Sequence, residues 1–283
     1  MTDTPTSTER KGRTDGTDAT AEPAVRVVDL TKDFPGGTRA LEGVAFDVPP
    51  GELTTLIGPS GCGKTTTLKI VAGLIPATSG QVIVKWQPVT GPGPERAFVF
   101  QDFALLPWAT VLRNAAFGLE LRGVPKAERE ATAREYVTKA GLAGFEQHHP
   151  HQLSGGMRQR VGLARALAVN ADILLMDEPF ASVDEQIRRT FQEDLLLLLA
   201  DERKTVLFVT HSIEEAVYVS DQIVILTRGP GRVSSVLRPD IARDGTSDEI
   251  RRSGAYLDTV ENIWGELRDY VEQDMRAAEG ATP

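Results

Sequence analysis

Short apolar runs alternate with stretches of helical periodicity along most of the chain. Each run is bounded by polar residues or glycine, which is typical of strands covered on both faces of a sheet. Apolar residues three and four positions apart mark the helices between them. The predicted strands are Val25–Val28, Leu53–Ile57, Gln81–Val84, Ala97–Phe100, Ile173–Met176, Thr205–Val209 and Gln222–Leu226. The predicted helices are Lys64–Ala72, Val111–Leu121, Lys126–Ala140, Gly156–Ala168, Glu185–Ala200 and Ile213–Val219.

This order of elements predicts an α/β protein, and three segments depart from it. Residues from about 102 to 168 carry helical patterns only, which indicates a helical subdomain inserted between two strands of the core. Residues 1–24 have almost no large apolar side chains, so we expect a disordered tail. After about residue 245 a last amphipathic helix follows, which either packs on its own domain or binds a partner. Its apolar positions are Tyr256, Leu257, Val260, Ile263, Trp264, Leu267, Tyr270 and Val271.

Charge and cysteine content narrow the class of protein. The chain of 283 residues has a formal net charge of -9, which argues against a nucleic-acid partner because phosphate backbones are bound mostly by Lys and Arg. Cys62 is the only cysteine, so no disulfide can form within the chain, as suits a reducing compartment. The longest apolar run, Leu195–Ala200, is far shorter than the ~18 residues of a spanning helix. We therefore expect no membrane-spanning segment, and the N-terminus does not resemble a secretory signal.

The segment Gly58–Thr65 matches the phosphate-binding loop pattern G-x-x-x-x-G-K-T between a predicted strand and a predicted helix. Glycines let backbone N–H groups point at phosphates, which also lie at the positive end of the helix dipole. Lys64 is expected to reach the β- and γ-phosphates, and Thr65 to offer its hydroxyl to Mg²⁺. Cys62 is either a redox-active thiol or a small residue that fits a tight turn. The predicted phosphate-binding residues are Gly58, Pro59, Ser60, Gly61, Cys62, Gly63, Lys64, Thr65 and Thr66.

A second buried strand ends in two carboxylates. Ile173–Met176 is followed by Asp177, Glu178 and Pro179. Taken alone, these carboxylates could cap a following helix, but a phosphate-binding loop in the same chain favours a catalytic pair. Asp177 is then expected to bind Mg²⁺ through water, and Glu178 to act as the general base that polarises the attacking water. Because proline disfavours the helical region for the residue before it, we expect Glu178 to be extended.

The segment His151–Arg160 precedes the acidic strand and resembles the signature segment of the ATP-binding cassette (ABC) family. Ser154, Gly155 and Gly156 at a helix start make an anion-binding site from a hydroxyl and free N–H groups. A second phosphate site in a chain with one phosphate-binding loop needs an explanation. In the ABC family it is a head-to-tail dimer, in which each signature segment closes over the ATP of the other subunit. The resemblance implies the same arrangement here.

Other motifs of the family match single residues of this chain. The resemblance implies that Gln101 contacts Mg²⁺ or the attacking water and that His211 holds the γ-phosphate. It also implies that Asp184, in the segment Ala181–Asp184, works across the dimer interface. Phe34 matches the aromatic residue that stacks on adenine, although a phenylalanine near a strand is often a core residue. Mg²⁺ would then have Thr65, Gln101 and Asp177 as its candidate ligands.

The resemblance covers roughly residues 25–236. It implies a P-loop NTPase core, a mixed sheet flanked by helices, with the inserted helical subdomain and an N-terminal antiparallel β portion. It divides the chain into the tail (1–24), an ABC ATPase domain (25–245) and a C-terminal helical extension (246–283). Met157 and Val183 stand where Gln and Leu are commonest, but neither change removes a phosphate-binding group. We therefore expect a competent ATP hydrolase that uses ATP and Mg²⁺.

A strongly apolar stretch, Phe100–Trp108, surrounds Gln101. It either tucks into the helical subdomain or forms a docking surface; in ABC importers the neighbouring groove receives a cytoplasmic helix of the membrane subunit. Together with Val111–Leu119 and Leu226–Val233, it resembles the subgroup that imports nitrate, sulfonate, taurine or bicarbonate. The implied partners are a second copy, transmembrane permease subunits and, indirectly, an extracytoplasmic solute-binding protein. The implied location is the cytoplasmic face of the cell membrane.

Other functions fit parts of this pattern. Among ABC ATPases that do not transport, DNA-repair proteins usually carry a long coiled-coil insertion and translation factors carry two cassettes, whereas this chain has one cassette and no long heptad run. The ATPase of a separate-subunit exporter or a lipid-trafficking system stays open. A P-loop kinase for a small metabolite should lack the Ser154 segment and the His211 motif. The importer subunit is the preferred interpretation.

Overall fold

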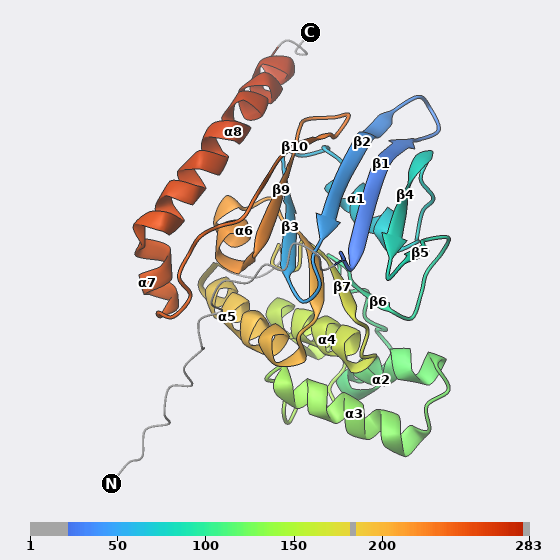
Figure 1. Cartoon of the computed structure of the whole chain (residues 1–283). Coiled ribbons are helices and arrows are strands. Elements are labelled where there is room, and N and C mark those ends of the chain that lie inside the picture. Colours follow the sequence, from blue (N-terminus) through green and yellow to red (C-terminus); the bar gives the residue numbers. More distant parts are fainter. Residues whose placement is uncertain (1–21, 182–184, 280–283) are drawn as a thin grey trace.

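The computed structural model describes residues 22–181 and 185–279, and its strands form two sheets (Figure 1). An antiparallel sheet has the order β2-β1-β4-β5, and a larger sheet has the order β10-β9-β3-β8-β7-β6. In the larger sheet the strands from β9 to β6 run parallel, while β10 pairs antiparallel with β9. The mixed sheet and the antiparallel N-terminal sheet confirm the predicted fold. The strands are β1 (Val25–Asp33), β2 (Arg39–Val48), β3 (Leu53–Ile57), β4 (Ser79–Val84), β5 (Gln87–Pro88), β6 (Arg96–Val99), β7 (Ile173–Asp177), β8 (Thr205–Val209), β9 (Gln222–Leu226) and β10 (Val233–Leu237).

Helices cover both faces of the larger sheet. Helix α1 lies between the two sheets and contacts β2, β7 and β8. Helices α2, α3 and α4 pack on one another below the sheets in Figure 1, and α4 connects this group to β6. The helices are α1 (Lys64–Val71), α2 (Val111–Leu121), α3 (Lys126–Lys139), the short 3-10 turn η1 (Pro150–Gln152), α4 (Gly155–Ala168), α5 (Glu185–Glu202), α6 (Ile213–Val219), α7 (Ser247–Arg252) and α8 (Gly254–Glu279).

Alternate side chains of the parallel strands face two hydrophobic clusters on opposite faces of the larger sheet. Along β8, Val206 and Phe208 belong to one cluster, and Leu207 and Val209 belong to the other. The first cluster includes residues of α2–α6 and α8; the second includes residues of α1 and the antiparallel sheet. Every residue of β3, β7, β8 and β9 is buried, as the period of two requires when both faces are covered. This packing fixes where the parallel strands end, and most of the candidate catalytic residues follow those ends.

The sequence pattern did not predict β2, β5, β10 or α7. In β2 the buried residues Leu41 and Val44 are three positions apart, because the register with β1 shifts between them. That shift interrupts the period of two by which a strand is recognised. Strand β10 lies at the edge of its sheet, and Val233 and Leu237 are only half-buried there. The signal from apolar residues was therefore weak at these strands.

Backbone hydrogen bonds to the antiparallel sheet begin at Ala24, one residue before the predicted start of the core domain. The N–H of Ala24 donates to the carbonyl of Val48 at 2.9 Å, and its carbonyl accepts from the N–H of Lys85 at 3.2 Å. Residues 1–21 of the predicted tail lie outside the described residues. The division of the chain into domains stays a prediction.

The C-terminal segment packs along the side of the core (Figure 1). Tyr256, Ile263 and Leu267 of α8 are buried in the larger cluster, and α8 contacts α6. The amphipathic helix therefore packs on its own chain, which was one of the two predicted alternatives; the other was binding to a partner. Leu257 and Trp264, which are seven positions apart and thus share a face of the helix, remain half-exposed.

Arg251 ties this segment to two core helices. Its guanidinium lies 3.8 Å from the ring centroid of Tyr218 in α6. Its Nη2 donates to Oε1 of Gln192 in α5 at 2.6 Å. Its Nη1 donates to the hydroxyl of Tyr256 at 3.4 Å. One side chain of α7 thus connects α5, α6 and α8.

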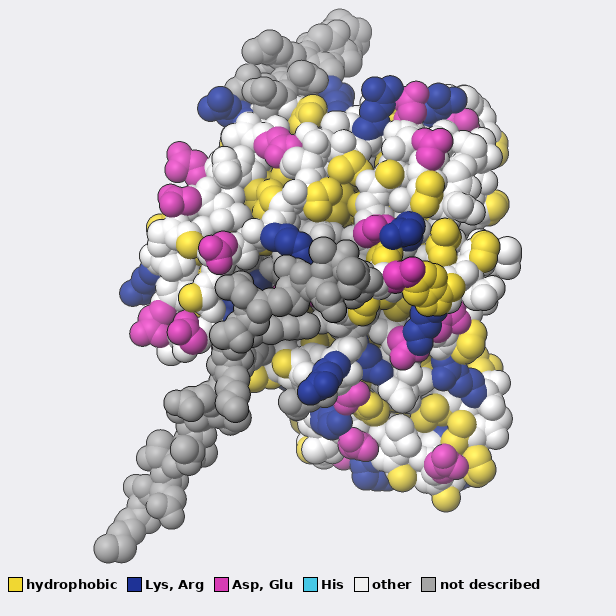
Figure 2. All heavy atoms as spheres, viewed as in Figure 1, with side chains coloured by type: hydrophobic (Ala, Val, Ile, Leu, Met, Phe, Trp, Pro, Cys, Tyr) yellow, Lys and Arg dark blue, Asp and Glu magenta, His cyan; other side chains and the backbone are white. Residues whose placement is uncertain are grey.

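Charges of both signs are spread over the face shown in Figure 2. Basic and acidic side chains lie next to one another there, and hydrophobic side chains are scattered between them. The negative net charge is therefore not concentrated in one patch on this face. In the part of the chain that the structure describes, no helix has the length and apolar character needed to cross a membrane.

Candidate functional site

The phosphate-binding loop (residues 58–65) connects the end of β3 to the start of α1. Lys64 is only 7% exposed, and its Nζ donates to the carbonyls of Gly58 at 2.8 Å and Pro59 at 3.0 Å. The ammonium group is thus held on the inner side of the turn that would surround phosphates. Thr65 and Thr66 are half-buried at the beginning of α1.

Gly63 stands directly before α1 with a φ of 92°, in the left-handed region where a Cβ would clash. A Cβ on Gly63 would also lie 3.0 Å from the carbonyl oxygen of Ala40, so β2 packs tightly against the loop. Cys62 is fully buried, and burial raises the pKa of its thiol although Lys64 opposes this shift. The thiolate is the reactive form of cysteine. The environment therefore favours Cys62 as a small residue in a tight turn rather than a redox thiol.

Thr65 and Asp177 meet at the end of β7. The hydroxyl of Thr65 donates to Oδ1 of Asp177 at 2.8 Å, across a sequence separation of 112 residues. Asp177 is buried, and burial raises the pKa of its carboxyl above the ordinary value. The hydrogen bond from Thr65 opposes the shift, and the charge of Glu178 adds to it. The structure thus brings together two of the three residues predicted to hold Mg²⁺.

A hydroxyl and a carboxylate are oxygen donors of the kind that Mg²⁺ binds. Among the described residues, no group of three or more His, Cys, Asp and Glu side chains could enclose a metal ion. Mg²⁺ characteristically takes one or two protein oxygens and completes its shell with water and substrate phosphates. The donor set of Thr65 and Asp177 fits that habit, and a fully protein-enclosed metal does not fit this site.

Glu178 and His211 follow the neighbouring parallel strands β7 and β8. Because the ends of parallel strands meet at one edge of the sheet, their side chains come together: Glu178 Oε2 lies 3.2 Å from Nδ1 of His211. The imidazole is exposed, whereas the carboxylate is mostly covered. A carboxylate held beside an imidazole at the sheet edge can take a proton from a water molecule.

Glu178 does not have the extended conformation that the sequence predicted. Its φ is 45°, in the left-handed region. Its N–H donates to the carbonyl of Val209 at 2.9 Å, and its own carbonyl accepts from the N–H of Ala181 at 3.1 Å. The chain therefore turns at Glu178 while still bonded to β8, and these bonds override the preference that Pro179 imposes. Non-glycine residues in this region cost about 1–3 kcal/mol and cluster at functional sites.

Gln101 is exposed and follows β6, the strand next to β7. The apolar stretch after it is partly docked on α4: the guanidinium of Arg165 donates to the carbonyls of Phe103 and Ala104, both at 2.7 Å. Burial lowers the pKa of Arg165. Phe103 and Ala104 have φ values of 58° and 43°, so this turn is held in an unfavourable conformation.

The two alternatives for the apolar stretch are each realised in part. Leu105 packs against the larger hydrophobic cluster. Trp108, in contrast, is 70% exposed, and Phe100 is also at the surface. The stretch is fastened to the helical group through its middle and presents apolar side chains at its ends.

The signature residues and the adenine candidate lie at the surface. Ser154 is exposed and caps α4, accepting a hydrogen bond from the N–H of Met157 at 3.3 Å. Gly155 and Gly156 form the first turn of that helix. Within the described part of the chain, no hydrogen bond joins these residues to the phosphate-binding loop.

Phe34 is 38% exposed under the ammonium of Lys32, so it is not a core residue. Ser182, Val183 and Asp184 lie outside the described residues.

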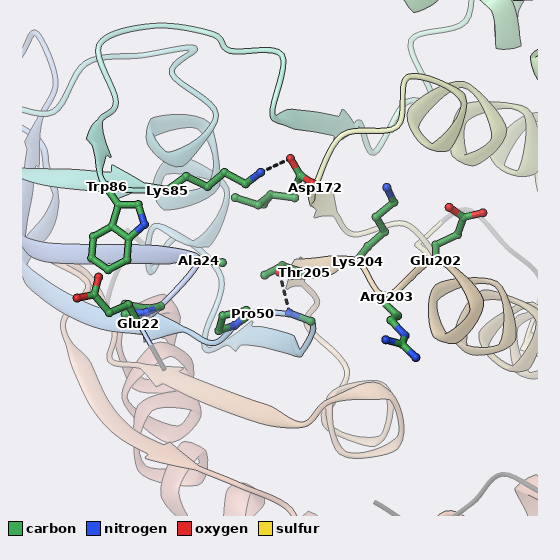
Figure 3. Close-up of a pocket in the computed structure, with 13 residues that line it drawn as sticks. Glu22, Ala24, Pro50, Lys85, Trp86, Asp172, Glu202, Arg203, Lys204 and Thr205 are labelled. Carbon is green, nitrogen blue, oxygen red and sulfur yellow. Dashed lines mark hydrogen bonds and ion pairs between the residues drawn. The ribbon is translucent and has the colours of Figure 1, made fainter. Parts of the chain in front are cut away.

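A pocket of about 330 Å³ lies at the other end of the parallel strands, where β3, β7 and β8 begin (Figure 3). It is lined by residues that precede β3, β7 and β8, among them Gly51, Asp172 and Lys204. An ion pair joins Lys85 to Asp172, and the N–H of Gly51 donates to the hydroxyl of Thr205 at 2.9 Å. None of the predicted site residues lines this pocket, because those residues follow the strand ends.

Two residues near the site were not singled out from the sequence. Arg165 is one arginine among several in α4, and nothing in the pattern showed that it binds the turn after Gln101. Gly231 lies in the segment Leu226–Val233, whose resemblance to a subgroup of the family gave Gly231 itself no role, and its Gly-Pro-Gly sequence indicates a turn. A Cβ on Gly231 would collide with the carbonyl oxygen of Cys62. The signal available in the sequence was the pair of glycines at 229 and 231, each next to an arginine, in a chain that also has a phosphate-binding loop.

Known proteins resemble this chain over most of its length. The family model described as ABC transporter matches residues 41–181. An uncharacterised ABC transporter ATP-binding protein of Methanocaldococcus jannaschii is 46% identical over 257 residues, which cover 89% of this chain and 94% of the relative. A taurine import ATP-binding protein of Chromobacterium violaceum is 50% identical over 78% of this chain and 85% of its own length.

A solved structure has the same architecture. It is a dimeric post-hydrolysis state of an ATP-binding cassette bound to ADP and Pi. It superposes with a TM-score of 0.67 at 32% identity, covering 76% of this chain and 98% of the cassette.

Proposed function

Because the chain belongs to the family of ABC transporter ATP-binding proteins and is an ATP hydrolase, we propose that it is the ATP-hydrolysing subunit of an importer. Two copies close head to tail around two ATP molecules and drive a separate membrane permease. The transported solute is a small anion such as nitrate, sulfonate, taurine or bicarbonate. The observation that carries the catalytic part is the pairing of Glu178 with His211 at 3.2 Å, at the sheet edge where the phosphate-binding loop begins.

In this proposal each side chain has one task. The backbone N–H groups of residues 58–65 and the ammonium of Lys64 bind the phosphates of ATP. Glu178 accepts the proton of the water that attacks the γ-phosphorus, and His211 holds the γ-phosphate beside it. Gln101 contacts the metal or the attacking water. Ser154 and its glycines, from the other copy, complete the phosphate site.

Thr65 and Asp177 hold Mg²⁺ in this proposal, because their oxygens already lie within hydrogen-bond distance of each other. When bound, the ion neutralises the charge that develops on the phosphate oxygens. Phe34 stacks on adenine, and Asp184 acts across the dimer interface. These two roles rest on the resemblance to the family, because the exposure of Phe34 only permits stacking and Asp184 lies outside the described residues.

The importer assignment is supported by the relative that is described as a taurine import protein and is 50% identical to this chain. It is also supported by Trp108, whose indole is 70% exposed next to the turn that Arg165 fastens. An aromatic side chain so exposed is a frequent feature of a docking surface. The membrane subunit is the proposed occupant.

The proposal is tested by extracting the tagged chain from its native host in mild detergent and identifying what co-purifies. We expect a polytopic membrane protein, and Trp108→Ala is expected to reduce its recovery at least about fivefold, as for an interface hot spot. Trp86→Ala is the matched control, because Trp86 is 65% exposed but lines the pocket at the other end of the parallel strands. Recovery of ribosomes or DNA instead of a membrane protein refutes the importer.

A further inference from the structure

The loop between β9 and β10 (residues 227–232) lies against the phosphate-binding loop. Its sequence is Thr-Arg-Gly-Pro-Gly-Arg. A Cβ built on Gly231 would come well inside 3.0 Å of the carbonyl oxygen of Cys62. A Cβ on Gly58 would likewise lie 2.6 Å from the carbonyl oxygen of Leu226, where β9 ends. The two segments therefore touch backbone to backbone, an approach that only glycine allows.

The other edge of Gly231 is bonded to β2. Its N–H donates to the carbonyl of Ala40 at 2.9 Å, and its carbonyl accepts from the N–H of Glu42 at 2.9 Å. Arg232 reinforces the connection, since its Nη2 lies 2.6 Å from Oε2 of Glu42. Gly231 is thus fixed between a strand of the antiparallel sheet and the phosphate-binding loop.

The contact with Cys62 acts on a donor of the phosphate site. The peptide group between Cys62 and Gly63 is planar, so the carbonyl of Cys62 and the N–H of Gly63 turn together. That N–H lies at the N-terminal end of α1, where the backbone donors of such loops point at phosphate. Pressure on the carbonyl oxygen therefore reorients a phosphate donor.

We infer that Gly231 is a positioning residue for nucleotide binding. It holds the Cys62–Gly63 peptide in the orientation that the phosphates require, and it links that orientation to β2. The inference rests on the proposed role of residues 58–65 as the ATP site. It assigns the β9–β10 loop a task inside the cassette that is independent of the membrane partner.

The test is the substitution Gly231→Ala, with ADP and Mg²⁺ as the ligand in calorimetric titration. The added methyl group displaces the Cys62 carbonyl, so the dissociation constant is expected to rise at least about tenfold, as misplacement of binding groups does. The KM for ATP rises with it, while kcat at saturating ATP stays within about threefold, because binding of ground state and transition state is lost equally. A dissociation constant within twofold of wild type overturns the inference.

Gly229→Ala is the matched control in the same loop. Its Cβ would lie 3.5 Å from the carbonyl oxygen of Gly61, an ordinary contact, so the dissociation constant is expected to stay within about twofold. Equal losses in both variants would overturn the specific role of Gly231. Melting of the nucleotide-free proteins shows whether each variant is folded.

A second perturbation covers the case in which Gly231→Ala does not fold. Thr227→Val removes the hydroxyl that accepts from the N–H of Arg232 at 3.1 Å and donates to the carbonyl of Arg228 at 3.2 Å. It loosens the β9–β10 loop without adding bulk, and a severalfold weaker ADP affinity is expected; unchanged affinity overturns the inference. Lys64→Ala separates the two proposals. If it leaves ADP affinity unchanged, the site itself is misassigned; if it alone weakens binding, only the role of Gly231 falls.

Discussion

Asp177 ends a fully buried strand, where burial disfavours the ionised form of its carboxyl. Burial raises the pKa of the carboxyl. The folded state therefore disfavours the charge more than the unfolded chain does. The resulting destabilisation is complete above the raised pKa and disappears as the pH falls below the pKa of the unfolded chain. Residues that serve a reaction often carry such a cost to stability.

Asp177→Asn is therefore expected to raise the melting temperature of the protein free of nucleotide and Mg²⁺ near neutral pH. Asparagine keeps an oxygen that can accept the hydrogen bond from Thr65 but carries no charge. The gain is expected to shrink as the pH falls through the raised pKa of the Asp177 carboxyl toward the pKa of an aspartate in the unfolded chain, about 3.9. Differential scanning fluorimetry from acidic to neutral pH measures this, and the same variant should lose ATP hydrolysis.

The control for this change is Asp172→Asn. Asp172 directly precedes the same strand, but its side chain is 56% exposed and forms a surface ion pair with Lys85. Its neutralisation should bring no gain, since surface pairs contribute little. A lower melting temperature for Asp177→Asn than for wild type at neutral pH contradicts the argument.

At the level of elements, sequence patterns predicted what depends on continuous burial. The apolar runs of β3, β8 and β9 have the same bounds in the sequence and in the structure, because both faces of these strands are covered. Edge strand β10 has one weakly buried face, and a register shift interrupts β2. Neither feature leaves a clear period in the sequence.

The candidate site divides in the same way. Motif order places Thr65, Asp177, Glu178 and His211 around the ends of parallel strands, and the structure brings them together in pairs. The left-handed turn at Glu178 and the close approach of Gly231 were not predictable. Both are set by backbone groups of other strands, which local residue preferences do not contain.

Arg251 connects helix α7 to the core helices α5 and α6. Arg251→Ala removes the stacking on Tyr218 and the hydrogen bond to Gln192. Together these should stabilise the fold by about 1–2 kcal/mol. The urea midpoint is expected to fall accordingly. Arg252→Ala is the neighbouring control, because Arg252 is exposed and its truncation should leave the midpoint unchanged; equal midpoints for all three proteins would show that Arg251 does not fasten the extension.

At the scale of the whole molecule, the proposed ATP site is divided between two copies. Ser154 is exposed at the start of α4, and Glu178 stands at the sheet edge. The proposed head-to-tail dimer would use the signature segment of one chain with the carboxylate of the other. In a two-fold symmetric dimer each site takes residues from both chains. Two chains with different defects can therefore together form one intact site.

Ser154→Arg and Glu178→Gln are each expected to abolish ATP turnover when alone. In an equal mixture, half of the dimers contain both chains and each mixed dimer has one intact site, so about a quarter of wild-type turnover should return. Phosphate release measured across mixing ratios tests this. Mixtures that stay as inactive as the separate variants argue against a shared site.

Cys62 has a practical consequence. It is the only cysteine of the chain, it is fully buried, and its pKa is raised. Such a thiol reacts slowly with maleimides and other alkylating probes. The wild-type protein is therefore a ready background for site-directed labelling. A cysteine introduced at Trp108 or at Leu257, both exposed, would carry the label alone, so spin or fluorescence distances between copies can be measured with the phosphate-binding loop intact.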